Sequence, residues 1–148
     1  MKKIIYIDMD NVLVDFKTGI SKLSKNTIEK FEGHLDDVPG IFNLMEPMKG
    51  SIEAFNELSQ SEKYDVYILS TAPWDNPTAW SDKLEWVKKY LGKNGYKRLI
   101  LSHHKNLNAG DYLIDDRTKN GADKFKGEHI HFGQDQFPAW DQVLEFFK

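Results

Sequence analysis

Short apolar runs alternate with helical patterns along the chain, and this order predicts an α/β fold with a mostly parallel sheet. Lys3 to Ile7 is rich in isoleucine, which is typical of a buried central strand. Four further runs predict the other strands: Val66 to Leu69, Leu99 to Leu101, Tyr112 to Ile114 and Ile130 to Phe132. No internal repeat or low-complexity linker interrupts the pattern, so residues 1–148 are predicted to form a single domain.

Three helical patterns accompany these strands. One is expected to be capped by Ser51. A second is expected to begin at Asn76-Pro77 and to stop at Gly92, with a core-facing apolar stripe formed by Trp80, Leu84, Val87 and Leu91. The last is expected to dock on the sheet through Trp140, Val143, Leu144 and Phe147.

The segment after the first strand is longer than a minimal crossover between strands. It is expected to hold a helix from about Thr18 to Phe31, followed by an irregular acidic stretch through Glu46. Residues 17–46 are therefore predicted to form a small helical cap on a core made of residues 1–16 and 47–148. Such an insertion is suited to act as a lid over a site.

Composition and charge narrow the classes of partner. The chain has 20 Lys and Arg residues against 23 Asp and Glu residues, and its lysines are interleaved with acids, so duplex nucleic acid is not an expected partner. A membrane is not expected either, because no apolar run approaches the roughly 20 residues that span a bilayer. The absence of cysteine excludes a thiolate zinc site and fits a cytoplasmic location. A small anionic ligand is compatible with the acidic balance where a metal offsets it, and a homodimer is left open.

Carboxylates follow two of the predicted strands. Asp8 and Asp10 stand where the first strand should end, and in an open α/β sheet ligands bind at the carboxyl ends of the strands. Two carboxylates this close repel unless a cation lies between them or one of them holds a proton, and Mg²⁺ suits such oxygen ligands. A second pair, Asp115-Asp116, follows the run that ends at Ile114. The same strand-end context therefore occurs twice.

Two more strand ends supply hydroxyl groups and a cation. Ser70-Thr71 closes one run, and Lys105 lies a few residues beyond Leu101. No glycine-rich loop follows the first strand, so neither a dinucleotide fingerprint nor a P-loop is present. A single aspartate after a strand is most often a turn or helix cap. Four strand ends that agree in order instead favour a site for a metal and a phosphoryl group, with an aspartate as the nucleophile.

These residues resemble motifs one to four of the haloacid dehalogenase-like (HAD) phosphatases. Longer segments resemble the 5'(3')-deoxyribonucleotidase family: Asp8 to Phe16, Glu46-Pro47, Thr71-Ala72-Pro73, Glu85 to Gly92 and Leu113 to Arg117. The matches extend to about Arg117, and the Glu85 to Gly92 stretch makes them specific, because the wider superfamily does not require it. The resemblance implies a HAD-like Rossmannoid three-layer sandwich with a small helical cap inserted after the first strand.

The resemblance also implies a reaction: Mg²⁺-dependent hydrolysis of phosphomonoesters, with (deoxy)nucleoside 5'- or 3'-monophosphates as substrates, through an aspartyl-phosphate. Asp8 would be the nucleophile, and Asp10 would act as general acid and then as general base. The metal would be held by Asp8, the backbone carbonyl of Asp10, and Asp116. The remaining roles would be phosphoryl binding by Ser70, Thr71 and Lys105, orientation of Lys105 or a metal-bound water by Asp115, and contact with the base or sugar by Phe16.

The chain departs from the family pattern at two places. Asn11 stands where the family usually has glycine, and asparagine tolerates a left-handed backbone better than most residues. The predicted cap is also shorter than in the well-known members, and its only aromatic candidates for a base-binding cluster are Phe31 and Phe42. The phosphate chemistry is therefore better supported than the nucleotide specificity.

Three alternatives are kept open by the residues themselves. The same chemistry could act on a sugar phosphate or another small phosphomonoester. A receiver-like phosphoacceptor module also gathers acids, a hydroxyl and a lysine around Mg²⁺, although its acceptor aspartate usually lies on a middle strand. A catalytically idle relative that acts through protein contacts is the third alternative.

Overall fold

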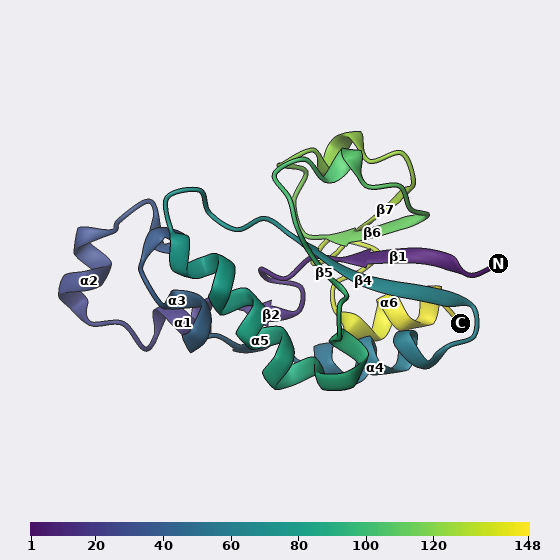
Figure 1. The fold of residues 1–148 in the computed structure, drawn as a ribbon, viewed down its shortest axis with the longest axis horizontal. Coiled ribbons are helices and arrows are strands. Elements are labelled where there is room, and N and C mark those ends of the chain that lie inside the picture. The colour runs from purple at the N-terminus through teal and green to yellow at the C-terminus, as the bar shows by residue number, and fades with distance from the viewer.

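Five parallel strands form one sheet in the computed structural model, which describes residues 1–148 (Figure 1). The strand order is β5-β4-β1-β6-β7, so the first strand is central, as predicted. The strands are β1 (Lys3–Ile7), β4 (Tyr64–Ser70), β5 (Leu99–Leu101), β6 (Tyr112–Asp115) and β7 (Glu128–His131). Because all pairings are parallel, the five carboxyl ends lie at the same edge of the sheet. The predicted strands are confirmed, although β4 begins earlier than expected and β7 ends one residue before Phe132.

Both faces of the sheet are covered. Three helices, α4 (Ser51–Gln60), α5 (Pro77–Gly95) and α6 (Trp140–Phe146), lie on one face (Figure 1). The other face carries two short 3-10 helices, η2 (Lys105–Leu107) and η3 (Ala122–Lys124), with their loops. The predicted three-layer α/β fold is confirmed, with 3-10 turns in place of long helices in the third layer. None of the helices combines the length and apolarity needed to cross a membrane.

Two of the expected helix ends differ from the prediction. Gly50, with a left-handed φ of 79°, occupies the N-cap of α4, and the Ser51 hydroxyl instead donates to the carbonyl of Leu13 at 2.8 Å. Gly92 does not stop α5, because the helix kinks there (φ 49°, ψ −126°) and resumes to Gly95. The docking of α6 is as expected, with Trp140, Val143 and Phe147 buried.

The predicted apolar stripe of α5 is buried only in its second half. Val87 and Leu91 are 3% and 4% exposed, whereas Trp80 and Leu84 are 37% and 42% exposed. The expectation that Trp80 packs in the core is therefore wrong. Helical periodicity identifies a face but does not say how much of that face the neighbouring strand covers, and β5 is only three residues long.

The segment between β2 (Val14–Asp15) and β3 (Glu46–Pro47) lies at one end of the molecule (Figure 1). These two strands pair antiparallel and bring the ends of the segment together. It contains α1 (Phe16–Ile20), α2 (Lys25–Lys30), η1 (Leu35–Asp37) and α3 (Ile41–Leu44). The prediction of one helix from Thr18 to Phe31 is wrong, because the hydroxyl of Ser24 accepts from the Thr27 N–H at 3.2 Å and caps a separate helix.

The first half of α5 fastens this segment to the core. Asn76 precedes the helix, but its side chain does not cap it. The Asn76 amide instead donates to the carbonyls of Asp36 and Val38, at 2.9 and 3.1 Å. At the middle of the helix, the Trp86 indole donates to the carbonyl of Met45 at 3.0 Å. The segment is thereby held beside the carboxyl ends of the strands.

Replacing Asn76 with alanine should lower the free energy of unfolding by about 2 kcal/mol, because two carbonyls in a largely buried place lose their donor. Denaturation in urea would measure this loss. The control is Asn26→Ala on the exposed surface of α2, which should change stability by less than about 0.5 kcal/mol. Equal stability of the two variants would contradict the anchoring role of Asn76.

Candidate active site

The predicted carboxylates meet at the carboxyl ends of β1 and β6. These strands are neighbours, and the Asp8 N–H continues their ladder by donating to the carbonyl of Ile114 at 2.9 Å. Asp115 is the last residue of β6, and Asp116 follows it. One carboxylate oxygen from each of Asp8, Asp115 and Asp116 lies within 4.8 Å of the other two. The structure therefore brings three of the predicted acids into one cluster.

A tight turn after β1 places Asp10 beside this cluster. The N–H groups of Val12 and Val14 both donate to the carbonyl of Met9, and Asn11 has a left-handed φ of 60°. The expectation that Asn11 supports the turn in place of glycine is confirmed. The turn is pinned from outside, because the Trp140 indole donates to the carbonyl of Val12 at 2.8 Å.

Lys105 lies in the middle of the acids. It is 3% exposed, and its ammonium donates to Asp8 Oδ1 at 3.0 Å and to Asp115 Oδ2 at 2.5 Å. Burial would lower the pKa of Lys105, but the neighbouring carboxylates outweigh it and raise that pKa. Asp115 also accepts from the Arg117 N–H at 3.0 Å through its other oxygen. Asp115 thus contacts Lys105, which is one of the two contacts that the family resemblance implied.

A second buried lysine, Lys83, was not among the predicted site residues. It lies on α5, is fully buried, and its ammonium donates to Ser70 Oγ at 2.7 Å and to Asp10 Oδ1 at 3.2 Å. It also lies 4.5 Å from the ring centroid of Phe42. The sequence does carry a signal, because Lys83 falls on the helical face that Ala79 and Val87 share by four-residue spacing. A buried charge needs a partner of opposite charge, and for Lys83 that partner is the Asp10 carboxylate.

The two hydroxyl groups after β4 have different surroundings. Ser70 is fully buried, and its hydroxyl accepts from Lys83, so it lies behind that lysine. Thr71 lines the small cavity beside the acids, and its hydroxyl donates to the carbonyl of Ser102 at 2.7 Å. That contact supports the loop that leads to Lys105.

The acidic cluster fits a hard divalent cation. Asp8, Asp10 and Asp115 form ion pairs with two ammonium groups, those of Lys83 and Lys105, whereas Asp116 forms none. The Oδ1 atom of Asp116 is buried and has no hydrogen-bond partner in the protein. Burial, and then the charges of Asp8 and Asp115, raise the pKa of Asp116 to about 7. Carboxylate oxygens are the ligands that Mg²⁺ prefers, and the unpartnered oxygen of Asp116 is available to such an ion.

Burial also acts on the two aspartates after β1. It raises the pKa of Asp8, although Lys105 opposes the shift, and it raises the pKa of Asp10, although Lys83 opposes it. Burial therefore disfavours the ionised form of both carboxyl groups, and a bound cation would favour it.

Two histidines of β7 support the loop that carries the second acidic pair. His129 Nε2 donates to the carbonyl of Asp115 at 3.0 Å, and His131 Nε2 donates to that of Asp116 at 2.9 Å. Their rings stack with centroids 5.0 Å apart. Alternation along the strand places both rings on one face, so they hold consecutive carbonyl groups.

Two adjoining cavities complete the site. The small polar cavity is lined by Asp8, Asp10, Thr71, Lys105, Asp115, Arg117, Lys119 and Asn120. The larger cavity has a volume of about 480 Å³ and is lined by Asp10, Asn11, Phe16, Gly33, Leu35, Asp36 and Arg117. Asp10 and Arg117 border both. Phe16 thus lies in a cavity of a size that small-molecule sites have, with the Phe42 ring 6.0 Å away.

The arrangement of elements is shared with solved structures of HAD-like hydrolases. A haloacid dehalogenase-like family protein of Streptococcus pneumoniae aligns over 99% of both chains with a TM-score of 0.62 and 16% identity. A HAD-superfamily hydrolase of subfamily IA from Geobacter sulfurreducens aligns over 86% of this chain and 85% of its own, with a TM-score of 0.50 and 12% identity. The chain therefore has a HAD-like α/β fold.

Sequence comparison resolves the family within this fold. Residues 26–137 match the family described as 5' nucleotidase, deoxy (pyrimidine), cytosolic type C, and the chain belongs to that family. A protein of Vibrio phage KVP40, provisionally named 5'(3')-deoxyribonucleotidase, is 63% identical over 98% of this chain and 84% of its own length. The human cytosolic-type 5'(3')-deoxyribonucleotidase is 25% identical over 95% of this chain and 78% of its own. The resemblance drawn from the motifs is confirmed, and with it the enzyme class, a phosphoric monoester hydrolase.

Replacing Asp116 with asparagine should stabilise the metal-free protein by roughly 2 kcal/mol, because it removes a buried negative charge that faces Asp8 and Asp115. We expect Mg²⁺ to raise the melting temperature of the wild type, and the same change should abolish that rise. Thermal denaturation with Mg²⁺ and with EDTA measures both effects. Asp123→Asn, at an exposed position on η3, is the control and should leave the Mg²⁺ effect intact. An undiminished Mg²⁺ effect in Asp116→Asn would contradict the metal site.

Proposed function

We propose that the chain hydrolyses deoxynucleoside monophosphates through an aspartyl-phosphate at Asp8, with Mg²⁺ as its cofactor. The observation that carries the proposal is the position of Asp8, which contacts Lys105 at 3.0 Å in a polar cavity that adjoins a larger, partly apolar one. The names of the relatives supply the substrate class. The cytosolic type of the human relative supports the cytoplasmic location expected for this chain.

The residues of the small cavity account for both halves of the reaction. The Asp8 carboxylate attacks phosphorus in line, and the bond from phosphorus to the nucleoside oxygen breaks as the new P–O bond forms. Asp10 gives its proton to the leaving oxygen. Asp10 then takes a proton from water, which attacks the aspartyl-phosphate, releases inorganic phosphate and restores the Asp8 carboxylate. Asp8, Asp116 and the backbone carbonyl of Asp10 would hold Mg²⁺, which would supply positive charge against the phosphoryl oxygens.

Lysine and hydroxyl groups would hold the phosphoryl group in place for this attack. Lys105 lies against the nucleophile, and Thr71 lines the same cavity. Ser70 would act through Lys83, whose ammonium bridges Ser70 and Asp10 and so fixes the direction of the general acid. Arg117 borders both cavities, which suits contact with an anionic group at their junction.

The larger cavity would hold the nucleoside. Phe16 offers an aromatic ring for the base or sugar, and Leu35 offers an apolar wall. Both residues belong to the segment that we propose as a cap, residues 17–46 together with the adjoining Phe16. The rest of the chain would form the core that carries the reacting groups.

Phosphate release from a panel of nucleoside and sugar monophosphates, with Mg²⁺ and with EDTA, tests the proposal. We expect Mg²⁺-dependent turnover that favours deoxynucleoside monophosphates such as dUMP or dTMP. Asp8→Asn and Asp10→Asn should each lower kcat by at least about a thousandfold, because the first removes the nucleophile and the second the proton donor. Asp123→Asn should keep wild-type turnover. Preferred turnover of sugar phosphates would keep the mechanism and overturn the substrate, and turnover in EDTA would overturn the metal dependence.

Replacing Lys83 with methionine should lower kcat about tenfold or more with a smaller change in KM, since the Asp10 carboxyl loses the contact that directs it. Steady-state kinetics on the best substrate of the panel would separate the two constants. Lys89→Met, at an exposed position of the same helix, is the matched control. If the two variants had equal kcat values, Lys83 would have no part in positioning Asp10.

A further inference from the structure

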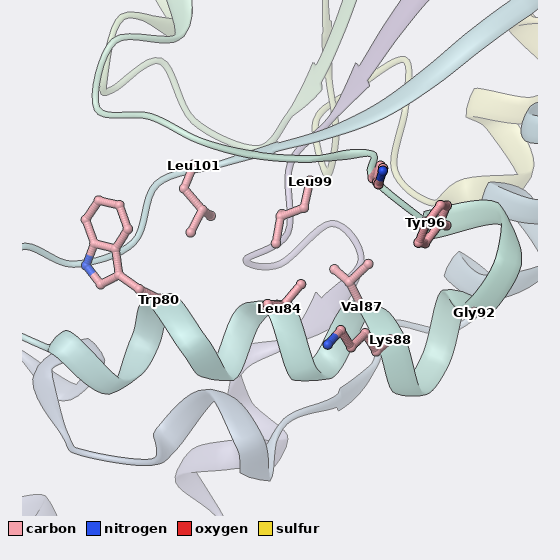
Figure 2. Close-up of a pocket in the computed structure, with 10 residues that line it drawn as sticks. Trp80, Leu84, Val87, Lys88, Gly92, Tyr96, Leu99 and Leu101 are labelled. Carbon is pink, nitrogen blue, oxygen red and sulfur yellow. The ribbon is translucent and has the colours of Figure 1, made fainter.

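An apolar groove lies between α5 and the edge strand β5, apart from the active site. In Figure 2, Trp80, Leu84 and Val87 point from the helix toward Leu99 and Leu101 of the strand. The groove has a volume of about 530 Å³. None of its lining residues borders either of the active-site cavities. The reaction proposed for this chain therefore leaves the groove without a role.

Three apolar side chains that line the groove are exposed. Trp80 is 37% exposed, Leu84 is 42% exposed, and Tyr96 at the other end of the groove is 69% exposed. Single exposed apolar residues need no explanation, but several that gather around one hollow are suited to contact an apolar ligand.

Two residues that line the groove have a left-handed backbone conformation. Gly92 and Lys97 both have left-handed φ values, of 49° and 57°. A side chain at Gly95 would come within 2.8 Å of Val87, so only glycine fits there. A left-handed backbone is uncommon for a lysine, and residues held in such conformations gather at functional positions. Here the strained residue places a charged side chain beside an apolar hollow.

The charge around the groove differs from that of the whole chain. The chain as a whole has a net charge of −3, whereas the only charged residues that line the groove are lysines. Lys88 and Lys97 line the groove, no acidic residue lines it, and neither lysine takes part in an ion pair. An apolar hollow with two unpaired ammonium groups is complementary to a molecule that is both apolar and anionic.

We propose that this groove binds a small amphipathic anion, with its apolar body against Trp80, Leu84 and Leu101 and its acidic group near Lys88 and Lys97. The volume is within the range of roughly 300–1,000 Å³ that small-molecule sites have. A second copy of the chain fits less well, because pairing two such grooves would bring like charges together. Addition of a peptide strand is also disfavoured, since β5 offers only three residues to pair.

Titration of the full chain with the fluorescent anion 8-anilinonaphthalene-1-sulfonate tests the proposal. We expect saturable binding of one dye molecule per chain. The uncharged analogue N-phenyl-1-naphthylamine should bind at least about threefold more weakly, because it lacks the group that the lysines attract. Asp8→Asn should bind the dye as the wild type does, since the active site is not involved.

Variants of the groove identify the place of binding. Leu84→Glu should abolish it, because the change puts a like charge in the apolar wall. Lys88→Glu should weaken it by at least about threefold, and Lys126→Glu, an equal change of charge at an exposed position elsewhere, should not. Lys97→Gly should weaken binding while it keeps or raises the melting temperature, because glycine accepts the left-handed φ of that position. Retained phosphate release would show that each variant is folded.

Three results would overturn the proposal. The first is dye binding that Leu84→Glu and Lys88→Glu leave unchanged, or binding of the uncharged analogue as tight as that of the anion. The second is a wild-type dimer in analytical ultracentrifugation that Leu84→Glu dissociates, which would make the groove a self-association surface. The third is displacement of the dye by a lower concentration of a peptide of alternating Glu and Leu than of decanoate. This result would assign the groove to strand addition.

Discussion

The compensation of buried negative charge is the constraint on which the rest of this structure depends. Four carboxylates lie at the ends of two neighbouring parallel strands, where each would cost several kcal/mol without a partner. The two lysines that offset them come from opposite layers, Lys83 from α5 and Lys105 from the 3-10 turn η2 on the other face. Both layers must therefore be in place before the acids can be buried. The carboxylate of Asp116, which forms no ion pair with either lysine, is left available to a cation.

The turn that carries Asp8 and Asp10 depends on segments remote in sequence. Trp140, near the C-terminus, donates to the carbonyl of Val12, and Ser51 donates to that of Leu13. Helices that look like ordinary cover for the sheet thus also fix the direction of the reacting side chains. This explains why Ser51 is not a helix cap. Its hydroxyl satisfies a buried carbonyl of the turn, while Gly50 provides the helix start with backbone geometry alone.

The sequence was sufficient to predict the position of residues that follow one simple rule of sheet geometry. Parallel strands end at a common edge, so polar residues after each apolar run, such as Asp8 and Asp115, could be placed together without coordinates. It was insufficient where the outcome depends on what covers a surface. Lys83 resembles any solvent-facing lysine until the burial of its helix face is known, and Trp80 resembles a core residue until β5 proves too short to cover it. Splitting of the predicted helix at Ser24 is a third case, because a local cap prevailed over a weak periodic pattern.

Helix α5 connects the active site with the groove, because lysines on its two faces have different surroundings. The buried face carries one lysine into a low-polarity region, where the contact with Asp10 is strong because water is excluded. The other face and the segment that follows it leave several lysines in solvent, where attraction to an anion is weaker and is screened by salt. A ligand at the groove would therefore need apolar contact as well as charge, whereas charge dominates at the active site. One face of α5 is buried and contributes a charged group to the active site. The other face lies beside β5, which is too short to cover it, and its apolar side chains stay exposed.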